Sequence, residues 1–135
     1  MNEEALHKTV VQFLMLALPD DVFWYHPANG EKRSKRTASK LKRMGVRPGV
    51  PDICIVHEGR ALFIELKKPG TPVGNRMEGR GYLTQTQCAC HRSLKQAGAE
   101  VVTCWSLEDV QDALRRWSIL PHSSIGGLFK AEGAA

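Results

Sequence analysis

The sequence has no long hydrophobic run and no internal repeat. A membrane-spanning helix needs about 18 or more consecutive apolar residues, and no such run is present. The chain begins MNEEALHK, which is acidic and lacks the apolar region of a secretory signal. We therefore expect a cytoplasmic protein that makes no membrane contact.

Cysteine pairs spaced as C-x-x-C are also missing, although the chain has four cysteines, at positions 54, 88, 90 and 104. Cys88, Cys90 and His91 lie close together, but their spacing is not that of zinc ligands. We expect buried or half-buried free thiols rather than a metal site or disulfides.

The length and composition are those of one ordinary globular domain. With 135 residues, 42% hydrophobic and 24% charged, the chain can build one core but not two. We predict a domain over residues 1–120 and a flexible C-terminal tail over residues 121–135.

Acidic residues are nearly missing from residues 31–47, where Glu31 is the only one. The chain has a net charge of +5, and eight of its 19 lysines and arginines fall in this stretch. They are Lys32, Arg33, Lys35, Arg36, Lys40, Lys42, Arg43 and Arg47. Such a cluster suits contacts with phosphates. On charge alone, a solvated helix face is an equally good interpretation.

Hydrophobic periodicity and turn residues predict the order α-β-α-β-β-α-β-α. The predicted helices cover residues 3–18, 34–44, 84–98 and 106–117, and the strands cover 22–26, 53–57, 61–67 and 100–105. Caps are expected at Ser34, Thr84 and Ser106, with Gly45 ending the second helix. This order predicts an α/β or α+β fold with one mixed sheet flanked by helices.

Glu58-Gly59, between two predicted strands, favours a two-residue hairpin turn. In that register Asp52 lies directly opposite Glu65, with Cβ atoms about 5 Å apart. A bulge at Gly59 would instead leave the two residues diagonal. Two carboxylates so close repel each other unless a cation lies between them, and oxygen ligands favour Mg²⁺ or Mn²⁺.

Lys67 shares the face of Glu65 because side chains alternate along a strand. A lysine beside carboxylate-bound metal can orient a water nucleophile or offset charge on a phosphoryl oxygen. These groups together suit phosphodiester hydrolysis. On spacing alone, an exposed strand end with a Glu65–Lys67 surface salt bridge is the alternative.

At these residues the sequence resembles a known nuclease group. Pro51-Asp52 followed by Glu65-Leu66-Lys67 resembles the signature of the PD-(D/E)XK nucleases, and Gly45-Val-Arg-Pro-Gly-Val-Pro-Asp52 resembles their VRR-NUC branch. The resemblance spans residues 3 to about 117 and implies a restriction-endonuclease-like core. Further matching positions are His26, Asn29-Gly30 and Leu83-Thr84-x-x-Gln87.

The resemblance implies roles for the hairpin residues. Asp52 and Glu65 would be ligands of a catalytic Mg²⁺ or Mn²⁺, with the Leu66 carbonyl as a further ligand. Lys67 would position or activate the attacking water. An acidic residue on the first helix is also typical, and Glu3 fits best because it lies three residues before the inward-facing Leu6.

Other implied site residues have structural alternatives. Gln87 would support the site or contact the substrate backbone, but Thr84-x-x-Gln87 is also a capping box. Glu3 could instead stabilise the positive end of the helix dipole, and Glu4 is the second choice for its role. His26 and Asn29 are possible substrate contacts. We expect His91, one turn after Gln87, to be structural.

The resemblance implies a metal-dependent DNA endonuclease that hydrolyses phosphodiester bonds, selective for branched, flap or junction DNA. Small stand-alone members look phage-like and dimeric, so a homodimer in a host cytoplasm is expected. The Gly-rich insertion at residues 69–81 carries Arg76 and Arg80, which could contact DNA. The alternatives are a non-catalytic nucleic-acid binding module on the same fold and a metal-free structural protein.

Overall fold

The eight predicted elements are all present, in the predicted order. The computed structural model describes residues 1–28, 34–72 and 83–121. The elements are α1 (Glu3–Ala17), β1 (Phe23–Tyr25), α2 (Lys35–Arg43), β2 (Ile53–His57), β3 (Arg60–Leu66), α3 (Gln85–Gln96), β4 (Glu100–Cys104) and α4 (Leu107–Arg116). Their ends differ from the predicted ends by at most two residues, a difference common at helix and strand ends.

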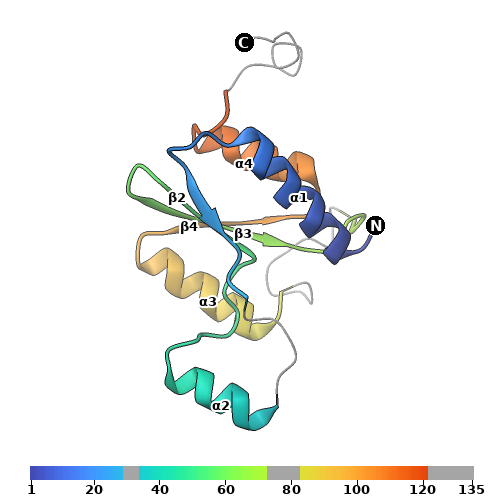
Figure 1. The fold of residues 1–135 in the computed structure, drawn as a ribbon. Helices are drawn as coiled ribbons and strands as arrows, with labels where there is room; N and C mark the ends of the chain where they lie inside the picture. The colour runs from blue at the N-terminus through green and yellow to red at the C-terminus, as the bar shows by residue number, and fades with distance from the viewer. Residues whose placement is uncertain (29–33, 73–82, 122–135) are drawn as a thin grey trace.

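The four strands form one mixed sheet in the order β1-β2-β3-β4. β1, β2 and β3 pair antiparallel, whereas β4 runs parallel to β3. A parallel pair needs a long crossover, and α3 provides it. Figure 1 shows α1 and α4 together on one face of the sheet and α3 on the other. The fold is therefore α+β, as predicted.

One face of the sheet packs with α1 and α4 to form the core. Apolar residues recur on α1 at a spacing of four, which makes a stripe along one side of the helix. The buried core residues include Leu6, Val10 and Leu14 of α1, Ile53 and Ile55 of β2, Leu62, Ile64 and Leu66 of β3, and Val110 and Leu114 of α4. Because strand side chains alternate, Glu65 projects to the α3 side, where it contacts Gln87 and His91. Asp52 and Lys67 lie just beyond the strand ends, at the rim of the sheet.

The hairpin between β2 and β3 has the predicted register. Ile53 pairs with Ile64 and His57 pairs with Arg60. Glu58 has a φ of 52° and Gly59 a φ of 75°, the two positive values of a type I′ turn. The alternative of a bulge at Gly59 is therefore wrong, and the strand ends meet as the two-residue turn predicts.

The basic helix α2 begins with the predicted cap, in which the Thr37 amide donates to Ser34 Oγ at 3.1 Å. It ends at Arg43, and Gly45, the predicted stop, follows the cap residue Met44 with a φ of 100°. The Val46 amide donates to the Leu41 carbonyl and the Gly45 amide to the Lys42 carbonyl, each at 3.0 Å. This Schellman closure turns the chain back toward β2.

The segment between α2 and β2 packs against the start of α3 at Gly49. Gly49 has a φ of 82°, and a Cβ atom built on it would lie 2.6 Å from the Thr86 backbone oxygen and 3.1 Å from the Gln87 nitrogen. Glycine is required here for both its conformation and its lack of a side chain. The Gly-Val-Pro-Asp string thus places Asp52 beside α3.

Several sequence expectations concern other parts of the chain. All four cysteines are buried and free, as predicted. None of the described helices is long and apolar enough to cross a membrane. Asn29, Gly30, Lys32, Arg33, Arg76 and Arg80 lie outside the described residues, as does the predicted tail beyond Pro121.

Candidate active site

Asp52 and Glu65 lie at the ends of β2 and β3, on the same side of the sheet. The pairing of Ile53 with Ile64, continued by one residue, sets them opposite each other. Asp52 Oδ2 accepts a hydrogen bond from the Leu66 amide at 2.7 Å. Asp52 is partly buried, and Glu65 is only 3% exposed. The two carboxyl groups therefore converge, as the hairpin register predicts.

The surroundings of Glu65 disfavour its negative charge. Burial, repulsion by Asp52 and a hydrogen bond with Asp52 raise the pKa of the Glu65 carboxyl to about 9. Lys67 lowers this pKa and Glu3 raises it, but both effects are smaller. A buried carboxyl with so high a pKa would ionise readily only beside a cation. The donor set of carboxylates thus fits a hard divalent ion.

Lys67 is held at the site from two directions. Its backbone amide donates to the Cys104 carbonyl at 2.9 Å, which continues the pairing of β3 with β4. Its Nζ donates to Gln87 Oε1 at 2.9 Å. The Lys67 ammonium is therefore fixed between the sheet and α3, on the same side as Glu65.

Gln87 combines the two roles that the sequence left as alternatives. The capping box is present, because the Thr84 amide donates to Gln87 Oε1 and the Gln87 amide donates to Thr84 Oγ1. The same side chain reaches Lys67, and its Nε2 lies 3.5 Å from Glu65 Oε2. The cap therefore orients Gln87 toward the acidic pair.

His91 contacts the site, although the sequence suggested only a structural role for it. Its Nε2 lies 3.4 Å from Glu65 Oε1, and the side chain is buried. His91 follows Gln87 by four residues and so lies on the same face of α3. That spacing is the sequence signal that would have identified it.

The N-terminal turns of α1 form the other wall of the site. Glu3, His7, His26, Asp52 and Leu66 line a cavity of about 380 Å³, together with Glu4 and Lys8. The charge of Glu3 contributes to the raised pKa of Glu65. Glu4 is paired instead with Lys8 at 3.0 Å on the surface. Glu3 is therefore the better placed of the two acidic residues.

Leu66 contributes its backbone to this cavity. Its amide is directed to Asp52, and in an antiparallel strand the amide and carbonyl of one residue point toward the same side. The Leu66 carbonyl is thus directed to the side of the cavity that Asp52 occupies. This orientation supports the ligand role that the resemblance implies.

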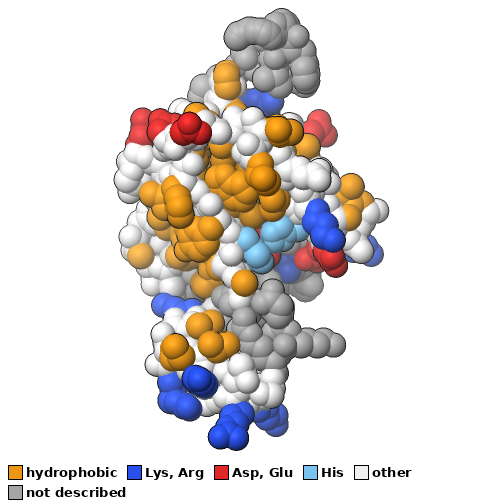
Figure 2. Space-filling model, viewed as in Figure 1, with side chains coloured by type: hydrophobic (Ala, Val, Ile, Leu, Met, Phe, Trp, Pro, Cys, Tyr) orange, Lys and Arg blue, Asp and Glu red, His pale blue; other side chains and the backbone are white. Residues whose placement is uncertain are grey.

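His7 and His26 pack against each other next to Asp52. His26 Nδ1 lies 2.7 Å from the Asp52 backbone oxygen, and the His7 and His26 rings pack edge to face with centroids 4.5 Å apart. Burial, and then the neighbouring His26, lower the pKa of His7. Figure 2 shows histidine side chains on the surface beside acidic ones. The sequence singled out His26 as a possible substrate contact but did not suggest His7.

The basic helix α2 lies below the sheet in Figure 1, and Lys and Arg side chains gather at the same lower end of the molecule in Figure 2. On α2 the side chains of Lys35, Arg36, Lys40, Lys42 and Arg43 are exposed, and Arg47 follows in the next loop. No residue of α2, which the structure describes in full, is buried. The helix therefore presents its charged side chains to solvent and contributes no buried residue to the core.

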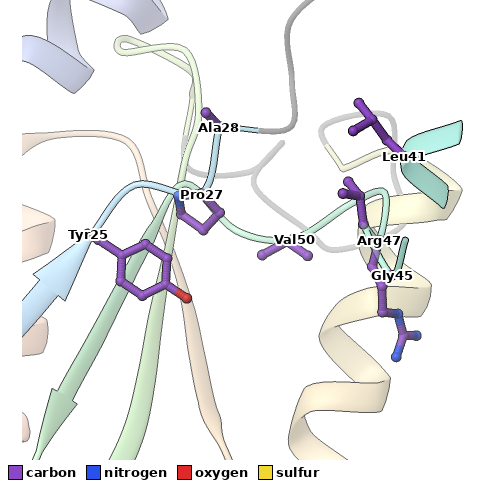
Figure 3. A pocket seen from close by; sticks show the side chains of 8 residues that line it. Tyr25, Pro27, Ala28, Leu41, Gly45, Arg47 and Val50 are labelled. Carbon is purple, nitrogen blue, oxygen red and sulfur yellow. The ribbon is translucent and has the colours of Figure 1, made fainter. Parts of the chain in front are cut away.

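An apolar pocket of about 470 Å³ separates α2 from the end of β1. Figure 3 shows Tyr25 and Pro27 on one side and Leu41, Gly45 and Arg47 on the other, with Val50 between them. Val50 lies two residues before Asp52, and Tyr25 directly precedes His26. The pocket thus lies between α2 and the segments that lead to His26 and Asp52.

The fold and this site together define an α+β domain in which a β-hairpin presents an Asp, a Glu and a Lys beside a helix-borne Gln. Among solved structures, a protein described as "VRR_NUC domain protein" has the same fold, with a TM-score of 0.63. The match covers 87% of this chain and 88% of that chain, at 22% sequence identity. Neither the family models nor the curated proteins give a match. The predicted resemblance is thus confirmed for the fold.

Proposed function

We propose that this protein is a nuclease of the VRR-NUC kind that uses a divalent metal ion to hydrolyse phosphodiester bonds in DNA. The observation that carries the proposal is the convergence of Asp52 and Glu65 next to a fixed ammonium group. Asp52 Oδ2 accepts from the Leu66 amide at 2.7 Å, and Lys67 Nζ donates to Gln87 at 2.9 Å. This combination of charges suits metal-assisted phosphodiester hydrolysis, since the acids can hold a metal ion and the ammonium can stabilise a developing negative charge.

Asp52, Glu65, the Leu66 carbonyl and Glu3 would hold Mg²⁺ or Mn²⁺. A cation bound there would act as a Lewis acid toward a phosphate oxygen. Its positive charge would also allow Glu65 to ionise, since the raised pKa of this carboxyl comes from burial and from Asp52. The protein supplies a cavity lined by Glu3, Glu4 and Asp52 for the ion.

Lys67 would act on the reacting groups. Its ammonium would donate hydrogen bonds to the attacking water or to a phosphoryl oxygen, and so stabilise the charge that develops there. Gln87 holds Lys67 and accompanies Glu65, which makes it a positioning residue in this proposal. His26, whose ring is tied to the Asp52 backbone, would face the substrate.

The DNA would lie across the basic surface of α2 and Arg47. The basic side chains of α2 are exposed, and the helix has no acidic residue. Their positive charge is therefore available to phosphates. Phosphate contacts position a protein on DNA but carry no base sequence information, which favours recognition of shape in flaps or branched junctions. A homodimer, as expected of small stand-alone members, is part of this proposal.

The test is a panel of labelled duplex, single-stranded, flap and four-way-junction DNAs, each with Mg²⁺, Mn²⁺ or EDTA. We expect cleavage that EDTA abolishes and that Asp52→Asn and Lys67→Met lose. Lys68→Met is the matched control, because Lys68 is the exposed neighbour of Lys67 and its side chain has no role in the proposed site. Cleavage that is equal in the wild type and both site variants would refute the proposal that Asp52 and Lys67 form a nuclease active site.

A non-catalytic binding module is the second candidate, and the exposed charges of α2 favour it. Such a module would bind DNA without a metal ion. It would leave the Asp52–Glu65 pair without a purpose. Salt-sensitive binding in EDTA, combined with no nicking of any substrate in the panel, would support the module over the nuclease.

A further inference from the structure

Beside the carboxylate pair lies a cluster of a different chemistry, formed by His7, His26 and Asp52. One ligand atom from each residue lies within 4.8 Å of the other two. They come from separate parts of the fold: His7 lies in α1, His26 directly follows β1, and Asp52 directly precedes β2. All three line the same cavity of about 380 Å³. The fold therefore brings two imidazoles and a carboxylate to one point.

We propose that His7, His26 and Asp52 form a binding site for a transition-metal ion such as Zn²⁺, next to the Asp52–Glu65 site and sharing Asp52 with it. Imidazole nitrogens favour Zn²⁺, Co²⁺ and Ni²⁺, whereas sites built only from oxygen ligands favour Mg²⁺. Three protein ligands also leave one position of a tetrahedral ion open for water or substrate.

The orientation of His26 supports a ligand role. A neutral histidine whose Nδ1 donates to a backbone carbonyl has its lone pair on Nε2, and His26 Nδ1 lies 2.7 Å from the Asp52 oxygen. Metal-binding histidines are commonly held in this way. Asp52 would thus contribute twice, with its backbone orienting His26 and its side chain binding the ion.

The charges around the cluster favour a cation as well. Glu3 and Glu4 line the same cavity, and Lys8, the one cation among the lining residues, is neutralised by Glu4 at 3.0 Å. His7 is partly buried and His26 is exposed, so an ion can reach both rings from solvent. The inference concerns metal binding and does not depend on nuclease activity.

The experiment titrates the metal-free, full-length protein with Co²⁺, whose visible absorption reports nitrogen and oxygen ligands directly. We expect a saturable spectrum in the wild type, and His7→Gln and His26→Gln each to weaken Co²⁺ binding by about tenfold or more. Gln12→Ala, an exposed change on the same helix, is the control and should bind as the wild type does. Circular dichroism verifies that each variant is folded.

A second titration with Mg²⁺, followed by thermal stability, separates the two sites. Asp52→Asn should weaken the binding of both metals. The two histidine variants should bind Co²⁺ more weakly but keep the increase in thermal stability that Mg²⁺ causes. Co²⁺ binding of equal strength in the wild type and both histidine variants would overturn the proposal. Absence of DNA cleavage together with histidine-dependent Co²⁺ binding would refute the nuclease and leave this metal site standing.

Discussion

Lys67 and Gln87 are joined by a hydrogen bond of 2.9 Å that links β3 to the first turn of α3. The Gln87 oxygen that receives it also accepts the Thr84 amide, and so closes the capping box of the helix. The start of α3 and the position of the Lys67 ammonium are therefore set by one side chain.

Replacing Gln87 tests this double role. Gln87→Ala should lower the free energy of unfolding by about 1 kcal/mol through loss of the cap. It should also reduce kcat by about tenfold, because Lys67 loses its partner. Thr84→Ala removes the cap hydroxyl but leaves the Lys67 contact, so it should lose stability with kcat retained. An equal fall of kcat in both variants would show that Gln87 acts only through the helix cap and not through its contact with Lys67.

The stability of the metal-free protein should depend on the ionisation of Glu65. Its pKa is about 9 when folded, against an ordinary 4.5. Between these values the folded state holds a proton that the unfolded state has released, so the free energy of unfolding falls as pH rises. The stabilisation that comes from the protonated Glu65 is complete below pH 4.5 and is lost as the pH rises toward about 9. Urea denaturation in EDTA should show this fall in the wild type.

Glu65→Gln provides the comparison for that measurement. A glutamine cannot titrate, so the variant should lose much of the decrease in stability between mildly acid and mildly alkaline pH. Mg²⁺ should stabilise the wild type more at the higher pH, because metal binding requires the ionised carboxyl. The same pH slope in the wild type and the variant would show that Glu65 titrates normally.

Gly49 should tolerate no side chain. Gly49→Ala would place a Cβ 2.6 Å from the Thr86 oxygen at a φ of 82°, so we expect a loss of about 1–3 kcal/mol in the free energy of unfolding. Gly45→Ala is the matched control, because Gly45 has a φ of 100° but open space around it. Chemical denaturation should therefore rank Gly49→Ala as clearly the less stable. Equal losses of stability in the two variants would mean that the positive φ, and not the contact with Thr86, determines the effect of the substitution.

The charges of α2 should control DNA affinity without affecting stability. Each lost phosphate contact should reduce the slope of log affinity against log salt concentration by about 0.9. Lys40→Ala with Arg43→Ala should therefore weaken binding and flatten the slope, and leave the melting temperature unchanged. Arg116→Ala on α4, at the opposite end of the molecule in Figure 1, is the control and should bind as the wild type.

Local chemistry was sufficient to predict the hairpin and its acidic pair. Glu58-Gly59 adopts the two positive φ values of a type I′ turn, and such a turn determines the register of both strands. The register in turn sets Asp52 opposite Glu65. Likewise Ser34 and Gly45 mark the ends of α2 through hydrogen bonds to their nearest neighbours.

The contacts that the sequence did not reveal are made between distant elements. His91 reaches Glu65, and His7 reaches His26, only because α3 and α1 dock on the sheet at particular angles. Periodicity identifies the inward face of a helix but not the residue that meets a given strand end. Helix residues that meet the ends of strands are therefore the hardest to assign from the sequence.

The freedom of α2 from the core has a consequence for how this protein can vary. Its nine residues bury no side chain and are closed at both ends by their own caps. Substitutions on its surface therefore meet no packing constraint, whereas those at Asp52 or Gly49 meet several. In the proposed nuclease, mutation of α2 could therefore alter DNA binding without changing the residues around Asp52 and Glu65, so the two parts of the protein could evolve at different rates.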